Sequence, residues 1–304
     1  MASSWSMFRK GSKMMLGCVV VPSIPVGIWY VSALQHRSKV EEEVRTKVRI
    51  PNVQTIDELM VEKCQPGDIV LFHRRWYHCA AGPLAALSCF FSQTFLCPQQ
   101  QEGTHNNLFD HMGIVISNPN SNNDKEKNLY LLEATAGSGI VARPLLTRLE
   151  MSQSKSVLLV PLTCPGERRT GNIEDTEQQS LKTIKIQTHF QDRLQQFATK
   201  WIQQSQQQGY VNHHSMLGIL GSFAYAFKFT KSLPSPISPS AWLVVNALQE
   251  SGAAMNLSER TSLETKVQDV LRDYRFHETD TIRLRPGWKF LSPVILRETT
   301  TSRS

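Results

Sequence analysis

The sequence predicts an α+β fold, with an antiparallel sheet packed against helices on one side and a membrane helix in front of it. Three observations predict this class. Short apolar segments alternate with turn-forming residues in the middle of the chain, amphipathic segments of helical length follow, and one long uncharged stretch lies near the N-terminus. Strands followed by helices in this way are typical of α+β domains.

The middle of the chain predicts an antiparallel meander. A turn containing Pro66 and Gly67 precedes the first apolar run, because proline fixes φ and glycine accepts unusual backbone angles. Two later β-rich segments are joined by a loop of Asn, Asp, Ser and Pro residues, which is typical of a hairpin. The expected strands are residues 69–72, 112–117, 129–134, 140–141 and 157–161, with 118–128 as the hairpin loop.

Apolar residues with helical spacing occur both before and after this meander. We expect helices at residues 56–62, 188–206 and 241–251, and a strand pair or a hooked strand at 287–296. Ser240 precedes the third helix, and serine is a preferred N-cap residue. It is therefore expected to cap a helix that begins at Ala241.

The charge of the chain is concentrated at its start. The 304 residues carry 33 Lys and Arg against 26 Asp and Glu, and the first acidic residue is Glu41. Five basic residues precede it, so the rest of the chain is nearly balanced, with 28 basic against 26 acidic residues. A basic patch for nucleic acid is not predicted for the body of the protein, and no nucleic-acid partner is expected.

Residues 14–35 form the uncharged stretch, and Lys13 precedes it. Its length allows one helix to span a bilayer, and Trp29 and Tyr30 suit the membrane–water interface. Two other interpretations remain: a signal peptide cleaved after residues 31–33, or a mitochondrial presequence that leads into an anchor. We expect a leader or anchor at 1–37, a stalk at 38–55, and a single-pass protein of the mitochondrial inner membrane or a secretory-pathway membrane.

His111 and Glu133 are the candidate acid–base residues. His111 opens one predicted strand, where an imidazole can act as a general base, and Glu133 lies on the next strand of the hairpin. If the two strands pair, the carboxylate can reach the imidazole and fix its orientation. A histidine beside an aspartate is also a common surface or capping residue, so the two residues alone leave both interpretations open.

The order of four segments, PGDIVLF, DHMGIVI, LYLLEA and AWLVV, resembles the circularly permuted papain-fold amidases. These belong to the NlpC superfamily and are related to the lecithin:retinol acyltransferase-like enzymes. The resemblance covers residues 60–296 and implies a permuted papain-like amidase domain at 56–298. It also implies an activity on amide or acyl-ester bonds, with His111 as base and Glu133 as its polar partner.

The chain departs from this family at the nucleophile. Where the family has a cysteine at the start of a helix, this sequence has Ser240, and no cysteine follows Cys164. A serine hydroxyl ionises far less readily than a thiol and needs a competent base and an oxyanion hole. We therefore expect a pseudoenzyme that binds a protein partner or a lipid or peptide ligand, or that serves in a membrane assembly.

Two alternatives remain open. The first is an active hydrolase or acyltransferase that uses Ser240, His111 and Glu133, and the second is a lipid-handling surface protein without chemistry. No cofactor and no metal are expected. The sequence contains no CxxC pair and no glycine-rich phosphate loop, and the HRRWYHC segment lacks a metal-ligand spacing.

Overall fold

The computed structural model of the chain describes residues 3–46, 55–78, 86, 89–90, 109–119, 128–135, 139–167, 181–207, 236–267, 269–270 and 283–298. Within the first helix, side chains are described from residue 25 onward. Residues 120–127 of the predicted hairpin loop, residues 47–54 of the predicted stalk and the side chains of the first half of the predicted anchor lie outside the described part of the chain.

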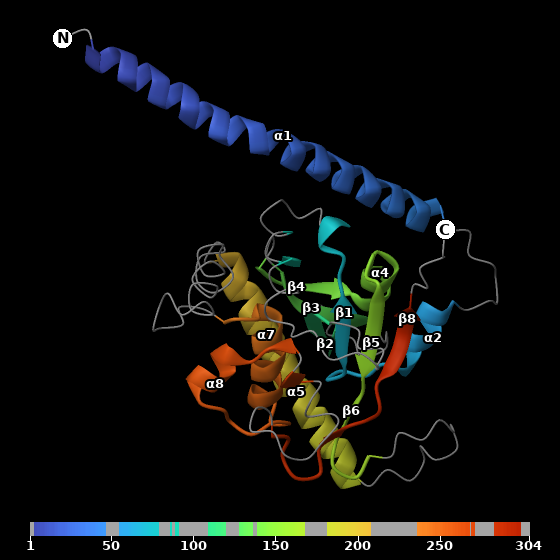
Figure 1. Ribbon diagram of the computed structural model, residues 1–304. Helices are drawn as coiled ribbons and strands as arrows, with labels where there is room; N and C mark the ends of the chain where they lie inside the picture. Colours follow the sequence, from blue (N-terminus) through green and yellow to red (C-terminus); the bar gives the residue numbers. More distant parts are fainter. Residues whose placement is uncertain are drawn as a thin grey trace, which may run out of the picture.

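A six-stranded antiparallel sheet forms the centre of the molecule (Figure 1). The strand order is β4-β3-β2-β1-β5-β8, and a small second sheet pairs β6 with β7. The strands are β1 Ile69–His73, β2 His111–Ser117, β3 Leu129–Thr135, β4 Gly139–Pro144, β5 Ser156–Val160, β6 Leu162–Thr163, β7 Lys289–Phe290 and β8 Val294–Glu298. The mixed α+β class and the antiparallel meander are confirmed, and the C-terminal segment forms two short strands.

Helices cover both faces of the sheet, so the expectation of helices on one side was wrong. One face packs against α5 and α7, and the other packs against α2 and α4. The cause is visible in the strands: β1 and β5 are apolar at consecutive positions, and continuous apolar runs are typical of strands covered on both faces. The helices are α1 Ser3–Thr46, α2 Ile56–Lys63, α4 Leu145–Glu150, α5 Leu181–Gln207, α7 Pro239–Glu250 and α8 Glu259–Glu264, with a 3-10 turn, η1, at Trp76–His78.

The turn before β1 is built by Gly67 and Asp68. Gly67 has φ of +103°, and a Cβ there would lie 2.7 Å from the ring of Phe190 on α5. Only glycine fits both the backbone angle and this close approach. The buried Asp68 carboxylate accepts hydrogen bonds from the N–H of Gln65 at 2.9 Å and of Leu162 at 3.0 Å. This turn therefore joins the start of β1 to the start of β6.

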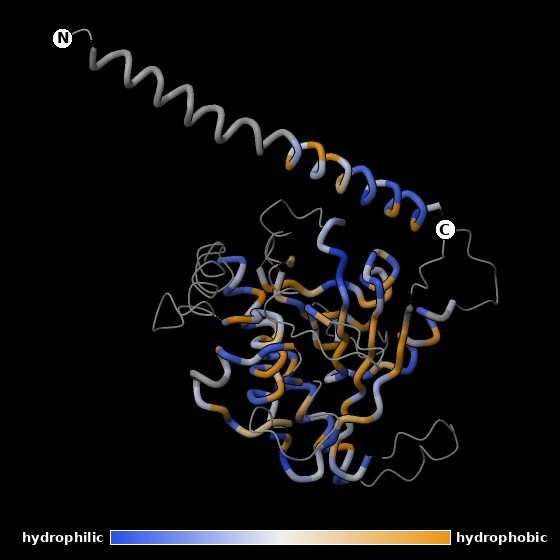
Figure 2. Tube along the Cα trace, in the orientation of Figure 1, coloured by the Kyte–Doolittle hydropathy of each residue, from blue (hydrophilic) through white to orange (hydrophobic). Residues whose placement is uncertain are grey.

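The N-terminal residues form one continuous helix, α1, which runs through the predicted anchor and into the predicted stalk. It lies along the end of the sheet from which η1 emerges (Figure 1). Figure 2 shows apolar residues giving way to charged ones along its described part. Among the residues that were described and searched, no helix has the length and apolar character needed to cross a bilayer.

Candidate functional site

The pairing of β2 with β3 brings His111 and Glu133 together. Gly113 lies directly opposite Glu133, and His111 is two residues away from Gly113, so both side chains project from the same face. Nε2 of His111 lies 3.0 Å from Oε1 of Glu133, and both side chains are almost completely buried. The prediction that these residues share a face and meet is confirmed.

Gly113 explains why the strands approach so closely here. A Cβ at this position would lie 2.8 Å from Cγ of Leu131 and 2.9 Å from the carbonyl oxygen of Leu132. A larger residue would push β2 away from β3. The glycine two residues after His111 is therefore a requirement of the sheet itself.

Arg148 is a third member of this cluster, and it was not among the predicted site residues. It comes from α4 and its Nε donates to both carboxylate oxygens of Glu133, at 3.1 Å and 2.8 Å. Its guanidinium also lies 4.3 Å from the ring centre of Phe72. Nothing in the local sequence pattern indicates that α4 folds back over β3, so this contact was not predicted.

The charges of this cluster follow from burial and from Arg148. Burial alone would raise the pKa of Glu133, but the charge of Arg148 and hydrogen bonds from His111 and Arg148 hold it far below its usual range. Burial lowers the pKa of His111, and the charge of Arg74 lowers it further against the opposing effect of Glu133. The carboxylate is therefore ionised and the imidazole is neutral near pH 7.

The tautomer of His111 follows from this pairing. An ionised carboxylate can only accept hydrogen bonds, so Nε2 must carry the hydrogen that is donated to Glu133. In a neutral ring the other nitrogen, Nδ1, is then a lone-pair acceptor. This is the state that a general base needs before it removes a proton.

Asp110 ties the end of β1 to the start of β2. Its buried carboxylate accepts from the backbone N–H of Arg74 at 2.8 Å, from Arg74 Nε at 2.7 Å and from Sγ of Cys89 at 3.3 Å. Its own N–H donates to the carbonyl of Phe72 at 3.1 Å. Asp110 thereby fixes the backbone immediately before His111, a positioning role that sequence analysis did not assign.

Ser240 lies within the first turn of α7, so its predicted role as an N-cap was wrong. The helix begins at Pro239, the N-cap position belongs to Ser238, and the side chain of Ser238 makes no capping bond. Proline is favoured at the first helical position, and this signal was available in the sequence. The Ser240 hydroxyl is buried and lies 3.5 Å from the hydroxyl of Ser238.

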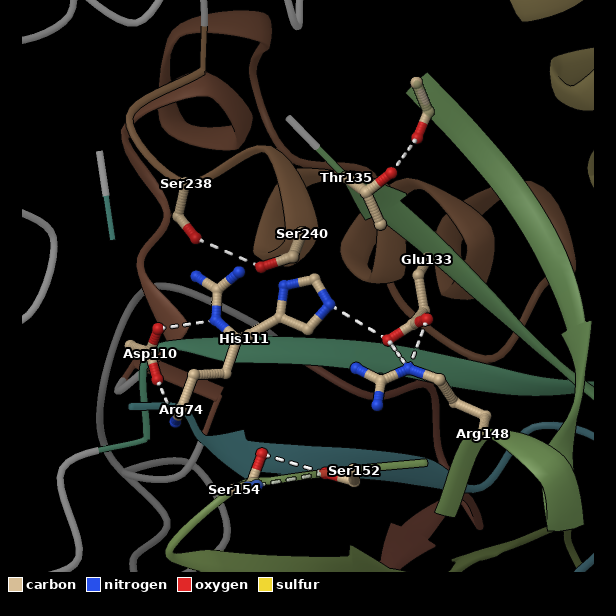
Figure 3. A network of polar contacts seen from close by, with 11 residues as sticks. Arg74, Asp110, His111, Glu133, Thr135, Arg148, Ser152, Ser154, Ser238 and Ser240 are labelled. Carbon is tan, nitrogen blue, oxygen red and sulfur yellow. Dashed lines mark hydrogen bonds and ion pairs between the residues drawn. The ribbon is translucent and has the colours of Figure 1, made fainter. Parts of the chain in front are cut away.

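Figure 3 shows the Ser240 hydroxyl on the side of the imidazole away from Glu133. α7 packs on β2 and β3, and its first turn lies at the end of β2 that begins with His111. The hydroxyl and the imidazole, both described, make no direct hydrogen bond. The structure thus brings Glu133 and His111 into direct contact, and Figure 3 shows Ser240 toward the opposite side of the ring without a bond to it.

Other reactive groups in the described residues are few. Cys64, Cys89 and Cys164 are buried, and Cys89 is the one that donates to Asp110. No cluster of three or more His, Cys, Asp or Glu residues suited to a metal ion occurs in the part of the chain that was searched. The comparisons with known proteins found no matching family model, no matching curated protein and no matching solved structure.

Proposed function

We propose that the chain is a membrane-anchored protein with a permuted papain-like amidase fold that binds a ligand or partner and does not turn over substrate. The observation that carries this proposal is the difference in bonding between the two sides of the His111 imidazole. Its Nε2 is bonded to Glu133, whereas the Ser240 hydroxyl beyond the other nitrogen is turned toward Ser238 at 3.5 Å. The order of the predicted family segments along the chain supports the permuted topology.

A serine in this position is a weak nucleophile unless a base is bonded to it. A thiol ionises near pH 8.5, and a helix N-terminus or a nearby histidine lowers that value, whereas a serine hydroxyl stays protonated and needs His111 in direct contact. The hydroxyl and the imidazole make no such contact. Binding at the His111 site without turnover is therefore the function that the geometry supports best.

A second candidate is an active hydrolase or acyltransferase on amide or acyl-ester bonds. Two observations favour it. His111 is held neutral with Nδ1 as acceptor, and Ser240 lies in the first turn of α7, where the N–H groups of Ser240 and Ala241 have no acceptor within the helix. Such N–H groups can stabilise an oxyanion, and catalytic hydrogen bonds are often long before substrate binds.

The membrane part of the proposal concerns residues 14–35. We propose that they anchor the chain as a single span, in the mitochondrial inner membrane or in a membrane of the secretory pathway. The partner would be a protein of a membrane assembly, or the ligand a lipid or peptide that binds at the His111 end of the sheet. No cofactor, metal or nucleic acid enters this proposal.

The decisive experiment restores the thiol. We expect Ser240→Cys to react with iodoacetamide near neutral pH faster than the native cysteines, because the α7 N-terminus and His111 both favour the thiolate. Ser238→Cys is the matched control, since it places a thiol two residues away on the same turn. The added reactivity should disappear when His111→Ala is combined with Ser240→Cys.

The unaltered protein provides the test between the two candidates. We expect no labelling of Ser240 by a fluorophosphonate, the reagent that marks activated serines. Labelling at Ser240 that is lost in His111→Ala would overturn the binding proposal and establish a serine hydrolase or acyltransferase. If Ser240→Cys is no more reactive than Ser238→Cys, the assignment of Ser240 to the nucleophile position is wrong.

A further inference from the structure

A cluster of aromatic side chains joins α1 to the body of the protein. Trp29 of α1 donates from Nε1 to the carbonyl of Tyr77 at 3.0 Å, and its ring centre lies 6.4 Å from that of Trp76. Trp76 in turn meets the rings of Tyr77 at 5.7 Å and Phe90 at 5.4 Å, both edge to face. We call Trp29, Trp76, Tyr77 and Phe90 the aromatic collar.

The collar is exposed to an unusual degree for such large side chains. Trp76 is 38% exposed, Tyr77 44% and Phe90 37%. Apolar residues of α1 beside it are also exposed, with Ile28 at 67% and Val31 at 53%. Several large apolar side chains gathered in one exposed patch indicate an interaction surface.

The residue types of the collar point to a lipid interface as the occupant. Trp and Tyr combine an apolar ring with a polar group and are enriched where a membrane meets water. Arg75 directly precedes Trp76 and places positive charge where anionic headgroups would lie, whereas the charge of Arg74 is paired with Asp110. The collar is also continuous with residues 14–35, which are expected to enter the bilayer.

The collar lies at the same end of the sheet as the candidate site. η1 follows β1, and Phe72 near the end of β1 pairs directly with His111 at the start of β2. Arg74, between them, is bonded to Asp110, the residue before His111. Figure 1 shows η1 rising from this end of β1 toward α1.

We propose that the aromatic collar docks at the membrane–water interface and holds the His111 end of the sheet against the headgroups. The proposal rests on the membrane anchor proposed above, and it adds contacts with the bilayer by Trp76, Tyr77 and Phe90, which lie outside residues 14–35. In this arrangement Trp29, Trp76, Tyr77 and Phe90 lie at the level of the lipid headgroups. A ligand that resides in the membrane then approaches the site along η1.

Depth-dependent quenching of tryptophan fluorescence tests the proposal. The full chain is reconstituted into vesicles of phosphatidylcholine and phosphatidylserine in which the phosphatidylcholine carries bromine near the headgroup end of its acyl chains. We expect Trp76→Phe to lower the quenched part of the fluorescence, because bromine quenches only indoles at its own depth. Trp288→Phe is the matched control, since Trp288 packs against Phe190 in the body of the protein, and it should leave the quenched signal unchanged.

The outcomes separate the docking surface from the anchor. If Trp29→Phe lowers the quenched signal and Trp76→Phe does not, the chain is anchored but the collar does not touch the bilayer, and this proposal is wrong. If alkaline carbonate releases the chain from membranes while Trp76 is still quenched, the anchor fails and the docking surface stands. Tyr77→Ser provides a second test, because it should move Trp76 out of reach of the bromine and weaken its quenching.

Discussion

The two sides of the His111 imidazole differ in how firmly they are held. On the Glu133 side, Arg148 and His111 bind one buried carboxylate through three contacts between 2.8 Å and 3.1 Å. On the Ser240 side, two hydroxyls meet at 3.5 Å, and no charged group among the residues that the structure describes bonds to either. A buried ion is strongly destabilising if one partner is lost, whereas a hydroxyl pair contributes little. The stability of the fold therefore depends on the His111–Glu133 half of the site, whereas Ser240 can be replaced with little loss of stability.

The largest expected effect comes from removing the charge that holds Glu133. Arg148→Leu leaves the carboxylate buried with only a neutral imidazole beside it, and we expect the free energy of unfolding to fall by about 3–5 kcal/mol. Adding Glu133→Gln to this variant should restore part of the loss, because the unpaired charge is then gone. Urea denaturation measures both changes.

Lys200→Leu is the control for this prediction. Lys200 pairs with Glu250 at 3.4 Å, and both side chains are about half exposed, so its removal should change the free energy of unfolding by less than about 1 kcal/mol. Equal losses for Arg148→Leu and Lys200→Leu would mean that the Glu133 side is no more firmly held than the surface.

Acidification should also lower the free energy of unfolding through the His111–Glu133 pair, by a smaller amount. The pKa of His111 is lower in the folded chain than its unfolded value of 6.5, so the unfolded chain binds more protons once the pH falls below that value. Stability is then lost as the pH drops, by no more than about 1.4 kcal/mol per pH unit for one group. Stability falls further below about pH 4.5, where Glu133 becomes protonated in the unfolded chain but stays ionised in the folded chain.

Thermal melts of the wild type and of His111→Gln between pH 7 and pH 5 isolate the contribution of His111. Burial also lowers the pKa of His73, so part of the pH dependence remains in the variant. We expect the variant to lose less stability than the wild type over this range. Parallel curves for the two proteins would show that the pKa of His111 is the same in the folded and the unfolded chain.

The smallest effect is expected at Ser240. Ser240→Ala removes only the 3.5 Å contact with Ser238, so the free energy of unfolding should change by less than about 1 kcal/mol. A loss comparable to that of Arg148→Leu would show that the Ser240 side contributes as much to stability as the Glu133 side. The same urea denaturation experiment gives both values.

Sequence reasoning found the parts of the site that depend on strand pairing. His111 and Glu133 could be paired in advance because side chains alternate along a strand, and the polar loop between their segments predicted a hairpin. Arg148 could not be found in this way, because its contact with Glu133 depends on how the short helix α4 packs against β3. α7 begins two residues before its predicted start, because Pro239 occupies the first helical position and Ser238 the N-cap position.

The placement of helices on both faces could have been predicted and was not. β1 carries apolar residues at all four of its buried positions, and β5 carries them at four of five, Ser156 being the exception; alternation on a one-sided sheet does not produce such runs. By contrast, the contact between Trp29 and Tyr77 joins residues 48 positions apart in segments with no pairing pattern. Packing of this kind becomes visible only in three dimensions.

The order of elements along the chain has a consequence for biosynthesis. β1 to β4 and α4 are complete by residue 150, so the buried ion cluster of Glu133 can assemble while the rest of the protein is still on the ribosome. α5 and α7, which cover the other apolar face, follow only after residue 180. Until they emerge, that face of β2 and β3 is open to water, and the nascent chain is exposed to aggregation and to capture by chaperones.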